Sequence, residues 1–271
     1  MPELPEVETI RRGIAPHIED QTIKTVIVRQ PKLRWPVPEE LNQTLTGLKI
    51  TAVTRRAKYL LFSTASGTLL IHLGMSGNLR ILPTQQDPGK HDHVDFIFTN
   101  GAVLRFNDPR RFGAVLWTTA PATEHPLLKA LGPEPLLTPF DGQWLYNLSR
   151  NRKLAVKAFI MDSHIVVGVG NIYANEALFL AGIRPDRQAG KISLPRFEKL
   201  ADSIRLTLEN AIQQGGTTLR DFVNESGNPG YFKQQLRVYG RTGLPCLHCQ
   251  APLQELRLSN RSSVYCRHCQ R

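Results

Sequence analysis

The first 245 residues contain no cysteine, and no part of the chain is a long apolar run. The lack of distributed cysteines excludes a disulfide framework of the kind that stabilises small secreted domains. A membrane-spanning helix needs about 18 consecutive apolar residues, so the sequence predicts no membrane segment. The start of the chain, rich in acids and prolines, lacks the positive charge and apolar stretch of a signal peptide. We therefore expect a cytoplasmic protein that does not associate with membranes.

Acidic residues are scarce relative to basic ones. The chain has 34 Lys and Arg against 23 Asp and Glu, which gives a formal net charge of +11. Such an excess favours a polyanionic partner, nucleic acid first. The hydrophobic content of 41% over 271 residues is enough for one large domain and a small module, or for two domains. It excludes a chain that is mainly disordered.

The hydrophobic pattern changes along the chain. Apolar residues at helical spacing predict a helix entered through Pro5. Short β-branched runs bounded by turn residues then predict antiparallel strands of a sandwich or barrel, at 22–28, 59–62, 68–73, 94–98 and 103–106. Five prolines and one glycine between Pro121 and Pro139 predict a domain junction. After it, helical spacing returns over 154–163, 171–181 and 193–214, so we expect an α+β protein.

All four cysteines lie in the last 26 residues. Cys246-x2-Cys249 and Cys266-x2-Cys269 are separated by sixteen residues, a spacing typical of a tetrahedral zinc site. The segment between the pairs can form only a hairpin, which is too small to bury a core without a metal. The alternatives are a redox-active dithiol pair or unligated thiols. Zinc ribbons often bind nucleic acid, but a zinc ribbon by itself does not specify a function.

The second residue offers a nucleophile. A small residue after Met1 generally permits removal of the methionine, and Pro2 would then carry a secondary amine. An α-amino group titrates near about 7.7 to 8.0, so a useful fraction is neutral and can condense with a sugar carbon to form a cationic iminium. Glu3 is placed for proton transfer if burial raises its pKa. The alternative is that these residues simply form the capped, extended start of the first helix.

Taken together, six segments resemble one family. Residues 2–9, 56–60, 90–93, 108–113 and 168–173 and the cysteine-rich end, in this order, resemble the bacterial formamidopyrimidine-DNA glycosylases. Members of that family are bifunctional enzymes that remove oxidised purines such as 8-oxoguanine. The resemblance implies an N-terminal β-sandwich (residues 1–132), a linker with a helix-two-turns-helix domain (133–230) and a C-terminal zinc finger (231–271).

The resemblance also implies catalytic roles. Pro2 corresponds to the nucleophile that attacks C1′ of the damaged nucleotide, and Glu3 to the group that protonates the opening sugar ring. Glu6 corresponds to a second essential carboxylate that is closer to positioning than to chemistry. Lys58 corresponds to a lysine that contacts the phosphate beside the lesion and assists the reaction. Arg261, on the finger, corresponds to a phosphate contact close enough to the sugar to assist elimination.

Extruding a base from the duplex leaves a gap that the enzyme must fill. Met75, Arg110 and Phe112 correspond to the family's insertion residues. An unbranched apolar side chain and an aromatic ring suit insertion between base steps, and a guanidinium can hydrogen-bond the orphaned base.

Further residues are implied to bind the DNA backbone or the lesion. His91 and Asn171 correspond to phosphate contacts, and the glycines before Asn171 suit close approach of an anion to a helix start. Lys157 corresponds to a basic residue that lines the lesion pocket. Thr217 and Arg220 lie in a segment that resembles the loop closing over the flipped base. The family more often has lysine where this chain has Arg220, so a planar guanidinium replaces the compact ammonium group of lysine.

We therefore predict a base-excision repair enzyme with glycosylase and abasic-site lyase activities. It would need one structural zinc ion and no redox or nucleotide cofactor, act as a monomer on double-stranded DNA that contains oxidised bases, and work at the bacterial nucleoid. Two alternatives are a related endonuclease for oxidised pyrimidines and a non-catalytic zinc-finger protein that recognises bent or damaged duplex.

Overall fold

The computed structural model describes residues 2–216 and 236–271, and its contacts divide the chain into two compact units. Among the described residues, the first unit contains 2–129 and the last three residues of a long helix, 214–216, and the second contains 130–213 and 236–271. The boundary lies inside the proline-rich segment between Pro121 and Pro139, where regular structure is confined to one short 3-10 helix, η1 (Ala122–Glu124).

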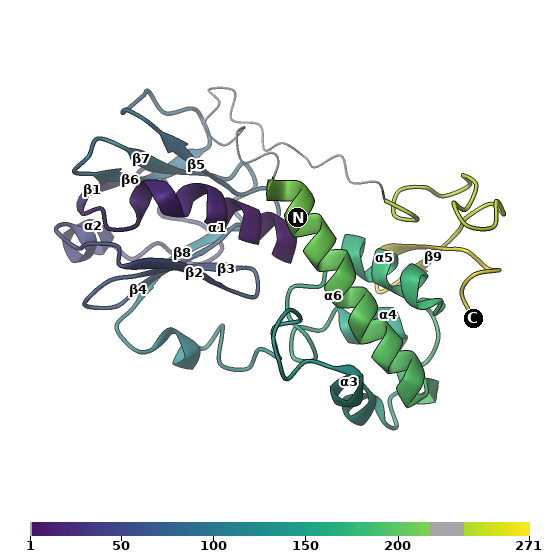
Figure 1. Cartoon of the computed structure of the whole chain (residues 1–271). Helices are drawn as coiled ribbons and strands as arrows, with labels where there is room; N and C mark the ends of the chain where they lie inside the picture. Colours follow the sequence, from purple (N-terminus) through teal and green to yellow (C-terminus); the bar gives the residue numbers. More distant parts are fainter. Residues whose placement is uncertain (1, 217–235) are drawn as a thin grey trace. The chain divides into compact units, whose positions relative to one another are not determined.

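The first unit is a sandwich of two four-stranded antiparallel sheets (Figure 1). One sheet has the order β1-β6-β7-β5, with β1 (Ile23–Val28), β6 (Asp92–Phe98), β7 (Val103–Asn107) and β5 (Asn78–Leu82). The other has the order β2-β3-β4-β8, with β2 (Ala52–Arg56), β3 (Tyr59–Ser63), β4 (Thr68–His72) and β8 (Ala114–Thr118).

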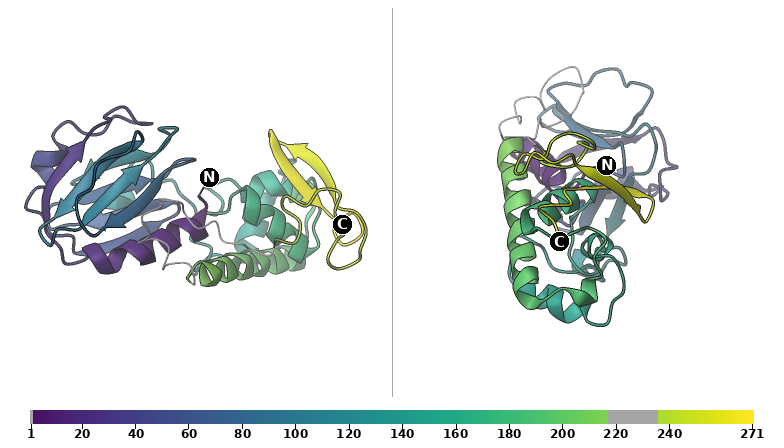
Figure 2. Two further views of the ribbon diagram at one scale, coloured as in Figure 1. Left: turned by 90° about the horizontal axis from the view of Figure 1, so that it is seen from above. Right: turned by 90° about the vertical axis from the view of Figure 1, so that its right-hand side faces the viewer.

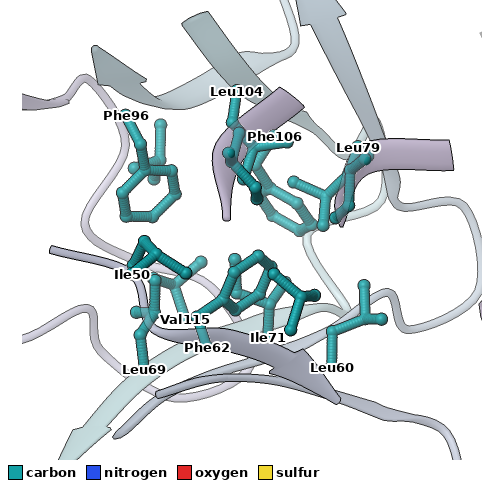
Figure 3. Packing of buried hydrophobic residues seen from close by; sticks show 14 of the residues in the cluster. Ile50, Leu60, Phe62, Leu69, Ile71, Leu79, Phe96, Leu104, Phe106 and Val115 are labelled. Atoms are coloured by element: carbon teal, nitrogen blue, oxygen red, sulfur yellow. The ribbon is translucent and has the colours of Figure 1, made fainter. Parts of the chain in front are cut away.

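The core of this unit lies between the two sheets. Figure 3 shows side chains of β3 and β4, such as Phe62 and Ile71, facing Phe96 and Phe106 of the opposite sheet. All four are at most 1% exposed, and each such burial stabilises the fold by roughly 2 kcal/mol before chain entropy is counted. These packed sheets form the rigid support for the loops that leave their edges.

Helix α1 (Leu4–Ile18) runs between the two groups of strands in Figure 1. Its apolar stripe, which includes Val7 and Ile14, joins the same core as the sheets. The first residue of the helix follows Glu3 directly, so packing of α1 fixes where the predicted nucleophile begins. A short helix, α2 (Leu41–Leu45), packs against β1.

The second unit is helical and ends in a hairpin. Its helices are α3 (Gly142–Ser149), α4 (Val156–Ile160), α5 (Asn171–Ala181) and α6 (Leu194–Gly216), with one 3-10 turn, η2 (Ala189–Lys191). Helix α5 ends at Gly182, whose φ of +71° is the left-handed conformation that glycine adopts without strain. The hairpin consists of β9 (Gln254–Leu258) and β10 (Arg261–Tyr265), and β10 packs on α5 (Figure 2).

The predicted α+β class is confirmed, while several elements differ from the sequence-based expectation. Strands β2, β5 and β8 and helix α3 were not predicted. Arginines interrupt the apolar pattern of β2 and β5, and polar residues interrupt that of α3, whereas β8 is an apolar run that the prediction did not include. The helix expected at 154–163 is shorter, covering Val156–Ile160. Within the described residues, no helix combines the length and apolar character that crossing a bilayer requires.

Candidate active site and nucleic-acid interface

The predicted nucleophile lies at the start of α1. Pro2 is half-buried, and Glu3, the N-cap residue of the helix, is only 3% exposed. The backbone N–H of Glu3 donates to Oε2 of Glu6 at 2.8 Å as part of a capping box. Glu6 therefore holds the residue next to Pro2 in place, which agrees with a positioning function for this carboxylate.

Lys58 lies in the two-residue turn that connects β2 and β3. The flanking residues Arg56 and Tyr59 are a register pair of the hairpin. The other turn residue, Ala57, is buried and has a φ of +54°, in the left-handed region that side chains other than glycine rarely adopt. Its carbonyl accepts a hydrogen bond from Nη1 of Arg55 at 2.8 Å.

A carboxylate of α1 is bound by arginines from two elements. Glu8 accepts hydrogen bonds from Arg11, Arg12 and Arg55, the last at 3.2 Å. Burial of Glu8 raises its pKa, but the hydrogen bonds from Arg11 and Arg12 and the charges of Arg11 and Arg55 outweigh burial and lower the pKa from 4.5 to about 2. Glu8 is therefore ionised throughout the physiological pH range.

The predicted insertion residues lie on two neighbouring loops of the sandwich. Met75 and Phe112 are each 43% exposed, although large apolar side chains are usually buried. Gly74 has a φ of +63°, and a Cβ there would overlap the backbone of Phe112. The guanidinium of Arg110 stacks on the Phe112 ring, 4.8 Å from its centroid. The structure thus brings all three predicted insertion residues together.

A buried carboxylate connects these loops. Asp108 is fully buried, and its Oδ1 accepts from the Ser76 hydroxyl at 2.6 Å while Oδ2 accepts from the Gly113 N–H at 2.7 Å. Its backbone N–H donates to the carbonyl of His91 at 3.0 Å. One residue therefore ties together the Met75 loop, the Phe112 loop and the predicted phosphate contact at His91.

His72, at the end of β4, supports the Met75 loop. Its Nδ1 accepts the Gly74 N–H at 3.1 Å, and its ring lies 4.7 Å from that of Tyr59. Burial, followed by the positive charges of Lys58 and Arg34, lowers the pKa of His72 from 6.5 to about 4. The ring is consequently neutral at physiological pH, which keeps Nδ1 available as an acceptor.

In the second unit, Asn171 is the first residue of α5, where the positive end of the helix favours phosphate. Its buried Oδ1 has no hydrogen-bond partner among the described residues. One turn later, the buried Glu176 accepts the backbone N–H groups of Arg237, Val238 and Tyr239 at 2.8, 2.9 and 2.9 Å. Helix α5 thus anchors the segment that leads into the finger.

Lys157 is 1% exposed, and its ammonium donates to the carbonyl of Ser262 at 2.6 Å and to the hydroxyl of Ser263 at 2.7 Å. Its position on α4 places the charge directly beneath β10. Arg261, the exposed first residue of β10, precedes this pair of serines. Both basic residues line a cavity of about 200 Å³ between α4 and the hairpin turn, together with Met161.

The four cysteines converge on one point. Their sulfur atoms lie within 4.8 Å of one another, with Cys246 and Cys269 at 3.9 Å and Cys249 and Cys266 at 3.4 Å. Tetrahedral zinc with Zn–S bonds of about 2.3 Å needs sulfur separations of about 3.8 Å. The geometry fits one zinc ion held by four thiolates, and the predicted structural zinc site is confirmed.

The structure therefore groups the predicted residues within each unit. The first unit holds the helix start, the Lys58 turn, the insertion loops and His91, whereas the second holds Asn171, Lys157, Arg261 and the zinc ligands. Thr217 and Arg220 lie outside the described residues, so the prediction for the lesion loop stays a prediction.

Sequence reasoning missed Arg55, Asp108 and Glu176, whose side chains hold backbone groups rather than face solvent. The signal for Glu176 was present: a charged residue within a helix that is otherwise almost wholly apolar needs a buried partner. Asp108 belongs to segment 108–113, but within that segment the resemblance implies functions only for Arg110 and Phe112. Nothing in the spacing of Arg55 distinguishes it from the adjacent Arg56.

Three family models match the chain. Residues 1–115 match the formamidopyrimidine-DNA glycosylase N-terminal domain, residues 131–223 the formamidopyrimidine-DNA glycosylase H2TH domain, and residues 243–271 the zinc finger found in FPG and IleRS.

Whole-chain relatives agree with these matches. The chain is 61% identical over 255 residues to the formamidopyrimidine-DNA glycosylase of Marinobacter nauticus, and 61% identical over 254 residues to that of Methylococcus capsulatus, with 94% of each chain covered in both cases.

Solved structures give the same result for the fold. The Lactococcus lactis formamidopyrimidine-DNA glycosylase bound non-covalently to DNA with an AP site is 32% identical, with a TM-score of 0.87 and 99% of each chain covered. A wild-type Lactococcus lactis Fpg with DNA containing N7-benzyl-Fapy-dG is 33% identical, with a TM-score of 0.89 and 99% of each chain covered. A MutM complex with DNA containing carbocyclic 8-oxo-G is 33% identical, with a TM-score of 0.87 and 100% of each chain covered.

Proposed function

The chain belongs to the formamidopyrimidine-DNA glycosylase family, and from this premise we propose how its residues remove a damaged base and cut the DNA strand. It is a base-excision repair enzyme, a DNA glycosylase with AP lyase activity that binds damaged duplex DNA. Its substrates would be oxidised purines, because the related structures are complexes with Fapy-dG and 8-oxo-G DNA. No observation favours a pyrimidine-specific or a non-catalytic protein.

The chemistry would begin at Pro2 after removal of Met1. Its secondary amine attacks C1′ of the damaged nucleotide, so that an N–C1′ bond forms, the bond to the base breaks, and the base leaves with the proton that the amine gives up. Glu3 supplies a proton to the ring oxygen, and the sugar opens to a cationic iminium. That iminium accepts electrons when a proton leaves C2′, which expels the 3′ phosphate, and δ-elimination then expels the 5′ phosphate.

The burial of Glu3 is the observation that carries this assignment. A carboxyl group that is 3% exposed, adjacent in sequence to a half-buried proline, is unusual unless it has a chemical or structural partner. Glu6 fixes the backbone at this point, so the acid and the amine keep a constant relation.

The insertion loops would hold the duplex open. Met75 and Phe112 are exposed and adjacent, as residues that replace an extruded base must be. Arg110 would leave the Phe112 ring to hydrogen-bond the orphaned base. Asp108 holds the two loops together by hydrogen bonds before DNA binds.

Phosphate contacts would come from both units. His91 and Lys58 in the first unit and Asn171 and Arg261 in the second are proposed to bind the backbone around the lesion. Lys157 would act in the lesion pocket through the cavity that it lines with Arg261. Thr217 and Arg220, outside the described residues, are proposed to contact the flipped base. Because its substrate would be duplex DNA, the enzyme would work at the nucleoid.

Borohydride reduction tests the proposal, because it converts the iminium into a stable amine. We expect wild-type protein to form a covalent complex with 8-oxoguanine duplex, with the modification on the peptide that begins at Pro2. The variant Pro2→Gly keeps an amine but loses the secondary one, so strand cleavage should fall while duplex binding remains. Pro121→Gly, in an exposed turn, is the matched control and should cleave normally. Undiminished cleavage by Pro2→Gly would refute the nucleophile.

A further inference from the structure

We propose that Arg55 is a positioning residue that couples the helix carrying the nucleophile to the turn carrying Lys58. The inference rests on the proposed function, because it takes Pro2 and Lys58 as the groups that act on the sugar and its phosphate. Arg55 itself need touch neither DNA nor sugar.

The first contact joins Arg55 to helix α1. Its Nε donates to Oε2 of Glu8 at 3.2 Å, and the two side chains are 11% and 10% exposed. Glu8 lies five residues after Glu3, on the same helix that begins beside Pro2. An α-helix is stiff over this length, so a contact that holds Glu8 in place also holds the start of the helix in place.

The second contact joins Arg55 to the turn. Its Nη1 donates to the carbonyl of Ala57 at 2.8 Å. Ala57 holds a left-handed conformation that costs roughly 1 to 2 kcal/mol for an ordinary residue, and such conformations persist only where neighbouring contacts enforce them. The peptide of Ala57 continues directly into Lys58, so its carbonyl orientation sets the direction in which the lysine leaves the turn.

The other two arginines on Glu8 serve different purposes. Arg11 donates to the carbonyl of Val53, which connects α1 to the beginning of β2. Within the described residues Arg12 donates only to Glu8, and its side chain is 48% exposed. Arg55 is the member of this cluster whose contacts reach the turn.

The chemical consequence concerns Lys58. A lysine stem has four carbons and many rotamers, so the location of its backbone limits where the ammonium can reach. Displacing a catalytic group by about 1 Å can lower a rate by about 100-fold. We therefore expect loss of the Arg55 link to slow the chemistry with little effect on DNA affinity.

The test uses the full-length protein with duplex containing 8-oxoguanine. The variants are Arg55→Met, which keeps the stem and removes every donor, and Arg12→Met, which removes a cation from the same carboxylate without a contact to the turn. Lys58→Met and the double variant Arg55→Met with Lys58→Met complete a mutant cycle. Single-turnover excision, borohydride trapping and the salt dependence of binding are measured for each, with thermal unfolding as a check on folding.

We expect Arg55→Met to slow excision and trapping at least about tenfold, with binding and its salt slope unchanged, while Arg12→Met matches wild type. The double variant should be no slower than Lys58→Met, because Arg55 has nothing left to position. Arg55→Lys keeps the charge but cannot reach both acceptors in the same way, so it should be slow as well and serves if the methionine variant unfolds.

Three results would overturn the proposal. The first is a wild-type excision rate in Arg55→Met or Arg55→Lys, and the second is a double variant whose rate loss equals the product of the two single losses. The third is a dependence of log affinity on log salt that is shallower by about 1 in the Arg55 variant, which would indicate a direct phosphate contact. Wild-type protein that traps no complex through Pro2 would overturn the proposed function and this inference together. Normal trapping by both wild type and Arg55→Met would overturn only the inference.

Discussion

At the scale of single residues, buried charges with several partners decide the local geometry. Glu8 and Asp108 have almost no contact with solvent, and each holds donors from different segments of the chain. A buried carboxylate is tolerated only if its hydrogen bonds replace those to water. In this sandwich both carboxylates hold segments that carry the groups proposed to contact DNA.

The depressed pKa of Glu8 leads to a prediction about acid stability. Because its pKa falls from 4.5 in the unfolded chain to about 2 in the fold, Glu8 stabilises the protein above about pH 4.5, and this contribution disappears as the pH falls toward 2. The expected size is on the order of 3 kcal/mol. In Glu8→Gln, the free energy of unfolding measured with denaturant should therefore change less between pH 5 and about pH 3 than in wild type. Equal slopes in the two proteins would contradict the assignment.

At the scale of elements, the loops matter more than the strands that carry them. The Met75 and Phe112 loops leave different strands, and they meet because Gly74 allows the backbones to touch and Asp108 bonds to both sides. His72 adds a third tie through the Gly74 N–H. An exposed methionine and phenylalanine are therefore held in place without being buried.

Gly74→Ala should separate the two loops. The new Cβ would overlap the Phe112 backbone, and the left-handed φ of +63° is strained for alanine, so the loops must move apart. We expect excision of 8-oxoguanine from duplex to slow, while cleavage of an already base-free site suffers less, since eversion is no longer needed. Gly101→Ala, also at positive φ but with open space around it, controls for backbone strain alone. Equal losses on both substrates would argue against a role in base extrusion.

At the scale of the whole molecule, charge and metal determine binding. The net charge of +11 attracts duplex DNA, and association should weaken steeply with salt as counterions are released. The finger adds a basic hairpin whose conformation depends on four thiolates and on contacts with α4 and α5. Neither the hairpin nor the thiolate cluster would be stable without the other.

Cys249→Ser should remove zinc and most of the DNA affinity, because three remaining ligands hold the ion poorly and Arg261 loses its support. Zinc content by mass spectrometry and the dissociation constant for lesion duplex at fixed salt provide the measurement. His268→Ser, at an exposed position between Cys266 and Cys269, is the control and should retain both. Tight binding by metal-free protein would count against the proposed contribution of the finger.

Much of the organisation could be predicted from local pattern. The helix at 171–181 and the cysteine spacing each reflect interactions over a few residues, and the structure has both as expected. The strand expected at 103–106 is present as β7, but nothing in the local pattern predicted that Arg105 within it is buried, at 1% exposed. Asp95 on the neighbouring strand forms an ion pair with Arg105 at 2.7 Å, and no local sequence pattern predicts a partner ten residues away.

The sequence by itself determined the chemistry available to this protein: a proline at position 2, a carboxyl group next to it, four cysteines at metal-ligand spacing and an excess of positive charge. Only the tertiary structure decided which side chains hold these groups in position. Arg55 reaches Glu8 across 47 residues, and Lys157 reaches Ser263 across 106. Such pairs arise because burying a charged group is unfavourable until a distant segment supplies its partner, and folding of the whole unit determines which segment that is.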